Sequence, residues 1–269
     1  MSVLRKYSVL VFLLIGSVVF AQYNVVHYKY IAKTPMYPDY IKDSFLLFNQ
    51  DKQYFLKPYT KDYKNYAALQ EDKSYYAVKK SNMTSLMRNI GEERYYGIGF
   101  AGQFWEIYYD DVPKIDWHIT EEHKDIMGYT TTKATAEFRG RKYTAWFSME
   151  MPYSVGPWKF SGLPGLILEV YDEDYMFNFI AQEIQMTNDV PIFPKFKYYE
   201  DHKNDMISYK AFIEKENGYK ISSLQQTYAN SSSGNTLSAR DLERMRDFDM
   251  EKTFEWEKNK KIDTSSLKK

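Results

Sequence analysis

Apolar and polar residues alternate with a period of two in several stretches of the first two thirds of the chain, which is typical of β-strands. Residues 45–48 and 53–56 flank the polar residues 49–52, and this spacing predicts a hairpin. A second apolar run over residues 166–171 is followed by an acidic turn and by renewed alternation over residues 177–186. We therefore expect a meander of antiparallel strands that packs one face on a core and exposes the other.

A further strand is predicted over residues 143–151, where side chains divide between two faces. The apolar face should pack in the core, and the other face should lie at the surface. The first face carries Tyr143, Ala145, Phe147, Met149 and Met151, and the second carries Thr144, Ser148 and Glu150 together with Trp146.

The last third of the chain has a different character. Residues 205–216 predict a short helix that ends at residues 217–218, an Asn-Gly pair. The Ser-, Asn- and Gly-rich residues 229–236 predict a loop, and Ser238 resembles the N-cap of a second, heavily charged helix. Residues 259–269 are expected to be disordered. The apolar stripe of the second helix would consist of Leu242, Met245, Phe248 and Phe254.

The N-terminus has the pattern of a secretory signal peptide. Arg5 and Lys6 precede an apolar run over residues 9–20, and cleavage is expected after Ala21. The run is shorter than the roughly 20 residues that span a bilayer core, so an uncleaved membrane anchor is the weaker interpretation. No cysteine follows the cleavage point, so a lipid anchor is not expected. We expect residues 1–21 to be removed from a protein exported to the periplasm or to the outer-membrane or extracellular side, with no transmembrane segment left.

The composition narrows the possible functions. The chain carries 36 Lys and Arg against 36 Asp and Glu, and removal of two basic residues in the first 21 would leave 34 against 36, a net charge of −2. A near-neutral chain argues against nucleic acid as a partner. There is no cysteine, so stability must come from a hydrophobic core, and the length suits one domain over residues 22–258. The 26 Tyr and 17 Phe favour a β-rich fold.

One stretch, residues 117–170, carries the motifs of a known family. It contains Trp117-His118-Ile119, Ile126-Met127-Gly128-Tyr129, Lys133-Ala134-Thr135, Phe138-Arg139-Gly140-Arg141, Ala145-Trp146-Phe147, Gly156-Pro157 and Gly162-Leu163-Pro164-Gly165-Leu166-Ile167. In order and spacing these motifs closely resemble the GLPGLI family, found mainly in the Bacteroidetes and named for the last hexapeptide. Many members carry a cysteine near the position of Thr131, so any role of that thiol is absent here. The resemblance implies an exported envelope protein and assigns no biochemical function.

The hexapeptide has turn chemistry of its own. Pro164 and Gly165 suit the two central positions of a type II turn, because proline fixes φ and glycine accepts a positive φ. Residues 156–157, a Gly-Pro pair, predict a second rigid corner, and Trp158 and Phe160 lie between the two corners. Two interpretations remain open: the loop plugs the end of a sheet with apolar side chains, or it is a rigid lip that contacts a ligand or partner.

The motifs that would indicate catalysis are incomplete. Residues 97–102 match the dinucleotide pattern G-x-G-x-x-G, but a strand-like sequence follows where a helix must begin. His118, Glu122 and His123 have neither of the spacings of a zinc protease. The acidic turn 172–174 lacks the rest of a calcium loop, and there is no Gly-x-Ser-x-Gly motif. We therefore expect no enzyme activity, no catalytic residue, no metal and no cofactor.

The predicted fold is a single α+β, β-rich domain: a curved antiparallel sheet or half-open barrel with C-terminal helices. The predicted function is non-catalytic binding of a hydrophobic ligand or a protein segment. One alternative is an accessory protein that docks on an outer-membrane TonB-dependent transport assembly, and a less favoured one is a metal-dependent hydrolase. The candidate ligand or partner contacts are Trp146, Trp158, Phe160, Leu163, Pro164 and Gly165.

Overall fold

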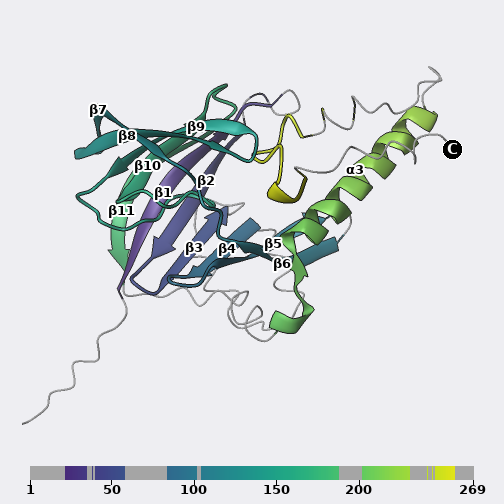
Figure 1. Ribbon diagram of the computed structural model, residues 1–269, viewed down its shortest axis with the longest axis horizontal. Coiled ribbons are helices and arrows are strands. Elements are labelled where there is room, and N and C mark those ends of the chain that lie inside the picture. The colour runs from purple at the N-terminus through teal and green to yellow at the C-terminus, as the bar shows by residue number, and fades with distance from the viewer. Residues whose placement is uncertain are drawn as a thin grey trace, which may run out of the picture.

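The computed structural model describes residues 22–34, 38, 40–57, 84–101, 104–187, 202–230, 241, 244 and 246–257. Within them, twelve strands form one sheet, and one long α-helix extends from its end (Figure 1). The predicted signal peptide and the predicted disordered tail lie outside the described residues. The strands are β1 (Tyr23–Ala32), β2 (Tyr40–Phe48), β3 (Lys52–Lys57), β4 (Thr84–Asn89), β5 (Arg94–Ala101), β6 (Phe104–Asp111), β7 (His118–Ile126), β8 (Tyr129–Phe138), β9 (Arg141–Ser148), β10 (Leu166–Asp172), β11 (Phe177–Thr187) and β12 (Ile207–Ser208). The helices are α3 (Tyr209–Asn230) and two 3-10 turns, Lys203–Asp205 and Glu255–Glu257.

The order of the strands shows why the sheet is curved. It is β12-β6-β5-β4-β3-β2-β1-β11-β10-β9-β8-β7, with antiparallel neighbours except for the parallel pair β12 and β6. β6 and β7 therefore lie ten strand spacings apart, about 48 Å along a flat sheet. Only residues 112–117 join them, and these span at most about 25 Å. The sheet must bend strongly, as Figure 1 shows, but it stays open. The predicted curved, antiparallel, β-rich fold is confirmed.

Both predicted hairpins are present. β2 and β3 pair Phe45 with Leu56, and β10 and β11 pair Val170 with Phe179. The strand predicted over residues 143–151 ends earlier than expected, because the chain turns after β9 into the loop that leads to β10. Met149 therefore leaves the sheet, and its side chain is 62% exposed rather than buried.

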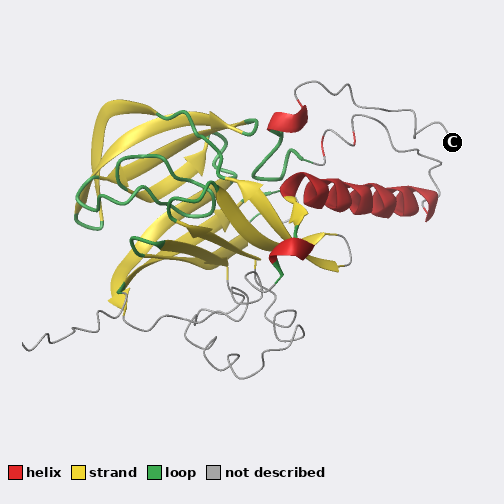
Figure 2. Ribbon diagram, turned by 60° about the horizontal axis from the view of Figure 1, so that its bottom comes forward, coloured by secondary structure: helices red, strands yellow, loops and turns green. Residues whose placement is uncertain are grey.

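The concave face of the sheet holds the main core. Side chains from distant strands, such as Tyr28, Phe55 and Phe179, belong to one buried cluster with the loop between β9 and β10. Figure 2 shows the loops gathered on the inside of the curved sheet. The expectation of one wet face fails for β1 to β5, since a second buried cluster covers their other face. That second cluster consists of Tyr23, Val25, Phe45, Leu47, Tyr54, Leu56, Met87 and Ile98.

The predicted helix over residues 205–216 is longer than expected. α3 begins at Tyr209 and continues past Gly218, where a Cβ would meet no other atom. A solvent-facing glycine costs a helix only about 1 kcal/mol and does not by itself end it. Only the start of α3 is buried, through Tyr209, Phe212 and Ile213, and the rest projects away from the sheet (Figure 2).

The glycines of the G-x-G-x-x-G match serve packing. Gly97 and Gly99 lie within β5, and β6 follows directly as the sequence predicted. A Cβ on Gly99 would approach Cζ of Phe212 to 2.7 Å, so the missing side chain is what lets α3 lie on the sheet.

The C-terminal segment, residues 246–257, lies against the β8–β9 hairpin. It is formed of turns and extended backbone before its final 3-10 turn, so the predicted second helix does not reach it. The backbone N–H of Lys252 donates to the carbonyl oxygen of Arg139 at 2.8 Å, and the hydroxyl of Tyr143 donates to the carbonyl oxygen of Met250 at 2.7 Å. In Figure 1 this segment, in yellow, lies between β9 and α3.

Candidate functional site

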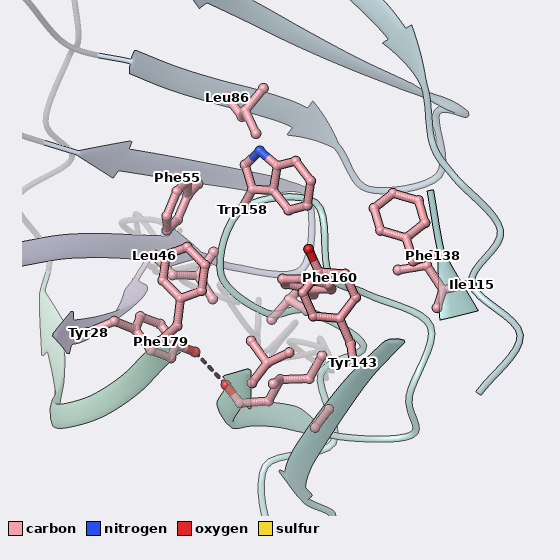
Figure 3. Close-up of a cluster of buried hydrophobic side chains, with 14 of the residues drawn as sticks. Tyr28, Leu46, Phe55, Leu86, Ile115, Phe138, Tyr143, Trp158, Phe160 and Phe179 are labelled. Atoms are coloured by element: carbon pink, nitrogen blue, oxygen red, sulfur yellow. Dashed lines mark hydrogen bonds between the residues drawn. The ribbon is translucent and has the colours of Figure 1, made fainter. Parts of the chain in front are cut away.

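The loop between β9 and β10 carries three of the predicted contact residues into the core. Trp158 and Phe160 pack edge to face, with ring centroids 5.3 Å apart, and Phe160 meets Tyr143 of β9 at 4.8 Å. Figure 3 shows both loop rings among side chains from the strands. Phe160 and Leu163 are each only 1% exposed. The loop between β9 and β10 thus fills the concave face with apolar side chains, as one of the two interpretations of the sequence expects. We call this loop the plug.

The hexapeptide turn differs from the sequence prediction. Gly165 is not in the left-handed region, so the predicted type II turn is wrong; the positive φ in this stretch belongs to Gly162, at 96°. Gly165 is required for a different reason, because a Cβ there would overlap the carbonyl oxygen of Ser148. Pro164 is exposed between the buried Leu163 and Gly165.

Trp146 lies apart from the loop aromatics, on the outer, convex face of the sheet. Its neighbours in β9, Ala145 and Phe147, belong to the concave core, and strand residues alternate between faces. The ammonium of Lys124 lies 4.3 Å from the centroid of the Trp146 ring and is also paired with Glu169. The six predicted contacts are therefore three buried plug residues, an exposed proline, a packed glycine and one outer-face tryptophan covered by Lys124.

Four buried charges that the sequence interpretation missed lie together beside the plug. We call them the ion cluster: Asp110 at the end of β6, Arg139 in the β8–β9 turn, Lys159 in the plug and Glu251 in the C-terminal segment. Their side chains are between 0% and 6% exposed. The signals in the sequence were an arginine beside the glycine of a hairpin turn and a lysine between two aromatic residues.

Each of the two cations in the ion cluster is paired with both carboxylates. The Nζ of Lys159 lies 2.8 Å from Asp110 and 3.1 Å from Glu251, and the guanidinium of Arg139 bonds the same two carboxylates, at 3.0 Å to Asp110. The hydroxyl of Tyr209 in α3 donates to Glu251, and its ring lies under the Lys159 ammonium, 3.5 Å from Nζ to the centroid. Two cations balance two anions, which removes most of the cost of burying them.

The buried charges shift the pKa values of Asp110 and Arg139 in the ion cluster, and of Tyr209 beside it. Burial would raise the pKa of Asp110, but Lys159 and Arg139 lower it below its ordinary value. Burial would lower the pKa of Arg139, but Glu251 and Asp110 raise it. Burial, with the charge of Glu251, raises the pKa of Tyr209 well above 10.0. These shifts favour the charged forms of Asp110 and Arg139 and the neutral form of Tyr209, which fits a structural lock that joins β6, the hairpin, the plug and the C-terminal segment.

A second buried ion pair supports the same hairpin. Arg141 lies 2.9 Å from Asp172 at the end of β10, and both side chains are 2% exposed. The Arg141 guanidinium also donates to the carbonyl oxygens of Asp249 and Asp247, which fastens the C-terminal segment. Burial raises the pKa of Asp172 despite the nearby arginine. Asp172 accepts the backbone N–H of Phe177 at 2.7 Å, so the acidic turn 172–174 has a structural use.

The His and Glu residues of β7 are separated. Glu122 is paired with Lys133 at 2.8 Å, and a ring nitrogen of His123 lies 3.2 Å from the hydroxyl of Thr132. His118 is at the other end of the strand. No group of three or more metal-binding side chains occurs in the part of the chain that the structure describes. Thr131 donates its hydroxyl to the carbonyl oxygen of Lys124 at 2.7 Å.

An open groove of about 590 Å³ lies on the outer face of β7 to β10. We call it the outer groove, and none of the predicted contact residues lines it. Beside it, the rings of Tyr171 and Tyr175 stack with centroids 4.5 Å apart and planes at 12°. No periodicity in the sequence marks the outer groove. Its sequence signal is a bulky aromatic residue, Tyr175, directly after the acidic turn 172–174. The groove is lined by Asp116, His118, Lys133, Thr135, Ala136, Glu137, Lys142, Tyr143, Thr144, Tyr171, Glu173 and Tyr175.

Comparisons with known proteins give a limited match. Residues 138–169 match a family described as "Protein of unknown function (Porph_ging)", and this stretch includes Arg139, Arg141, Lys159 and the whole hexapeptide. A comparison with curated proteins finds no match. Two structures of PNGF-II, in space groups P21 and C2, are similar at 15% identity, with TM-scores of 0.45 and 0.47. They cover 63% and 73% of this chain and 29% and 34% of theirs, so the chain spans about a third of their length. No described helix is long and apolar enough to cross a membrane.

Proposed function

We propose that this chain is an exported envelope protein of the GLPGLI type that binds a ligand without catalysis, and that it does so in the outer groove. The motifs in residues 117–170 and the match of residues 138–169 to a family of unknown function support the first part. The charged and apolar pattern of residues 1–21 supports export.

The observation that carries the proposal is the contrast between the two candidate places. Trp158 and Phe160 of the plug are 8% and 1% exposed, and the plug occupies the concavity that a hydrophobic ligand would need. The outer groove instead has free volume, an exposed aromatic ring at Tyr175 and hydroxyl groups from Thr135 and Thr144. A concave site with a few polar groups and aromatic surface is the common form of a ligand site.

The absence of catalysis is proposed from the groove's own groups. Lys133 is paired with Glu122 at 2.8 Å, and Lys142 with Glu173 at 3.4 Å, so neither lysine is set up as a base or nucleophile. Among the residues that the structure describes, His118 belongs to no group of three or more His, Asp or Glu side chains that could hold a metal ion.

The test is native mass spectrometry of the mature protein purified gently from its own envelope, before and after denaturation. A mass excess that disappears on denaturation identifies a bound ligand. The Thr144→Arg variant places a long cationic side chain in the outer groove, and Thr130→Arg makes the same change at an exposed position at the far end of β8. We expect the excess to be lost in the first variant and kept in the second; equal retention in both would place the ligand elsewhere.

A second candidate function is docking on an outer-membrane transport assembly. It is favoured by exposed apolar side chains at the opposite rim of the sheet, where β8 and β10 begin. Met127, Met149 and Met186 are 42%, 62% and 68% exposed there, beside the exposed Pro164. Methionine adapts well to partner surfaces. A photo-crosslinker at position 149 should capture an outer-membrane protein in cells, whereas one at Thr144 should not; the reverse pattern would remove this candidate.

A further inference from the structure

Four side chains that lie opposite one another on neighbouring strands form the floor of the outer groove. His118 of β7 is opposite Thr135 of β8, Thr135 is opposite Thr144 of β9, and Thr144 is opposite Tyr171 of β10. All four line the groove. Adjacent strands are about 4.8 Å apart, so the row is about 14 Å long. Each of these four side chains can donate and accept hydrogen bonds, which suits a ligand rich in hydroxyl groups.

Tyr175 forms an aromatic wall at one end of this row. Its side chain is 54% exposed although one ring face rests on Tyr171. A large part of the other ring face is therefore open to solvent beside the groove. A ring in this position can stack against a flat, weakly apolar surface, such as the C–H face of a sugar ring.

The backbone of Tyr175 adds an independent observation. Its φ is 52°, a left-handed conformation that a bulky residue adopts only with strain. Glycine or asparagine relieves that strain in turns of this kind, so the fold alone does not call for tyrosine here. Strain retained at an exposed aromatic residue beside a groove indicates that the ring itself is needed.

The charges of the outer groove argue against an anionic ligand. Both of its lysines are already paired with carboxylates, Lys133 with Glu122 and Lys142 with Glu173. The groove also contains Asp116 and Glu137, so its formal charge is not positive. Carboxylates are strong acceptors for hydroxyl donors but repel phosphate, sulfate and uronate groups.

From these observations we propose that the outer groove binds a neutral oligosaccharide, with one sugar ring on Tyr175 and the next along the row of Thr144, Thr135 and His118. This rests on the proposed function and specifies its ligand class. The length of the row, about 14 Å, selects a short oligosaccharide over a single sugar.

The experiment is isothermal titration of the mature chain with neutral tetrasaccharides: cellotetraose, maltotetraose, mannotetraose and chitotetraose. Heparin tetrasaccharide is the anionic probe, and acetyl-hexaserine amide supplies hydroxyl groups without sugar rings. We expect at least one neutral tetrasaccharide to bind and both other probes to bind at least tenfold more weakly. Binding of none of the neutral sugars, or preference for heparin or the serine peptide, would overturn the proposal.

Substitutions distinguish the role of the Tyr175 ring from the strain in the Tyr175 backbone. Tyr175→Asn relieves the left-handed strain and removes the ring, and Met127→Asn makes the same backbone change, from φ 57°, at the opposite rim of the sheet. We expect Tyr175→Asn to weaken sugar binding at least tenfold with an unchanged or higher Tm, and Met127→Asn to leave binding unchanged. Tyr175→Phe, which keeps the stacking ring, should keep most of the affinity. A fall in Tm of more than about 4 °C for Tyr175→Asn would mean that the ring serves the hairpin, and would overturn the proposal.

Different results would show that the proposed ligand class is wrong and that the proposed site is wrong. A ligand that copurifies, is lost in Thr144→Arg and has no mass of sugar units would keep the outer groove and refute the oligosaccharide. A neutral sugar whose binding is the same in Thr144→Arg and in the unchanged chain would refute the outer groove as its site.

Discussion

Replacement of Glu251 by glutamine tests the ion cluster directly. Glu251 accepts hydrogen bonds from Arg139, from Lys159 at 3.1 and 3.3 Å, and from Tyr209. The Glu251→Gln substitution keeps the shape of the side chain but leaves Asp110 as the single buried carboxylate of the ion cluster, beside two buried cations. The amide also offers only one acceptor oxygen where the carboxylate offers two.

The expected magnitude follows from burial. The four charged side chains are at most 6% exposed, and breaking a buried ion pair by removing one partner costs about 3–5 kcal/mol. Glu255 provides the matched control, because it binds the same Arg139 at 3.1 Å but is 57% exposed. An exposed pair contributes about 0–1 kcal/mol, so Glu255→Gln should have little effect.

The assay is urea unfolding followed by tryptophan fluorescence. With a slope near 3 kcal/mol/M, the Glu251→Gln midpoint should fall by about 1–1.7 M urea, and the Glu255→Gln midpoint should move by less than about 0.3 M. Hydrogen exchange should also speed up at the amide of Lys252, which bonds the carbonyl of Arg139 in the hairpin. Adding Lys159→Met to Glu251→Gln restores one cation to one anion, so the double variant should lose less stability than the two single losses added together.

Equal, small effects of Glu251→Gln and Glu255→Gln would refute this reasoning. They would mean that the cluster is hydrated and contributes no more than surface ion pairs do. A large loss for Glu251→Gln with no change in exchange at Lys252 would keep the cluster but refute its role in fastening the C-terminal segment.

Three further predictions concern the plug and the pH dependence. Gly165→Ala should lower Tm by several degrees, because its Cβ would overlap the carbonyl oxygen of Ser148, which belongs to the backbone and has little freedom to move; an unchanged Tm in calorimetry would contradict this. Phe160→Ala should cost about 3–5 kcal/mol of unfolding free energy, measured by urea titration, since the ring is 1% exposed; a cost under 1 kcal/mol would mean that the plug is loose. The lowered pKa of Asp110 gives stability that is present above its unfolded pKa of about 3.8 and is lost as pH falls through the lower folded value. The raised pKa of Tyr209 gives stability that is present below about pH 10 and is lost as pH rises above it; urea midpoints measured from pH 3 to pH 11 should fall at both ends, and a flat profile would contradict both.

The local elements were largely predictable because they depend on neighbouring residues. The hairpins around residues 49–52 and 172–174 follow from alternation and turn composition, and both appear as predicted. The strand predicted to follow the G-x-G-x-x-G match, where a nucleotide site requires a helix, is present as β6. The two errors in α3 and at Gly165 share a cause: a glycine can serve a turn, a solvent-facing helix position or a close approach, and local sequence does not distinguish them.

The candidate sites needed the tertiary structure, because they join residues that are distant along the chain. Asp110, Lys159 and Glu251 are each unremarkable in sequence, and only the curved sheet brings them within hydrogen-bond distance of Arg139. The outer groove likewise depends on strand register, which sets Thr135 opposite Thr144.

By itself the sequence determined that this is a cysteine-free, aromatic-rich β-protein with a Gly-Pro loop between two strands, and export remains its prediction from residues 1–21. Only the tertiary structure decided which way that loop faces. Trp158 and Phe160 point into the core because the bend imposed by the short link between β6 and β7 creates a concavity that must be filled. The groove that we propose as the ligand site lies on the outer face, where cross-strand pairing rather than sequence proximity places hydroxyl groups beside an exposed tyrosine.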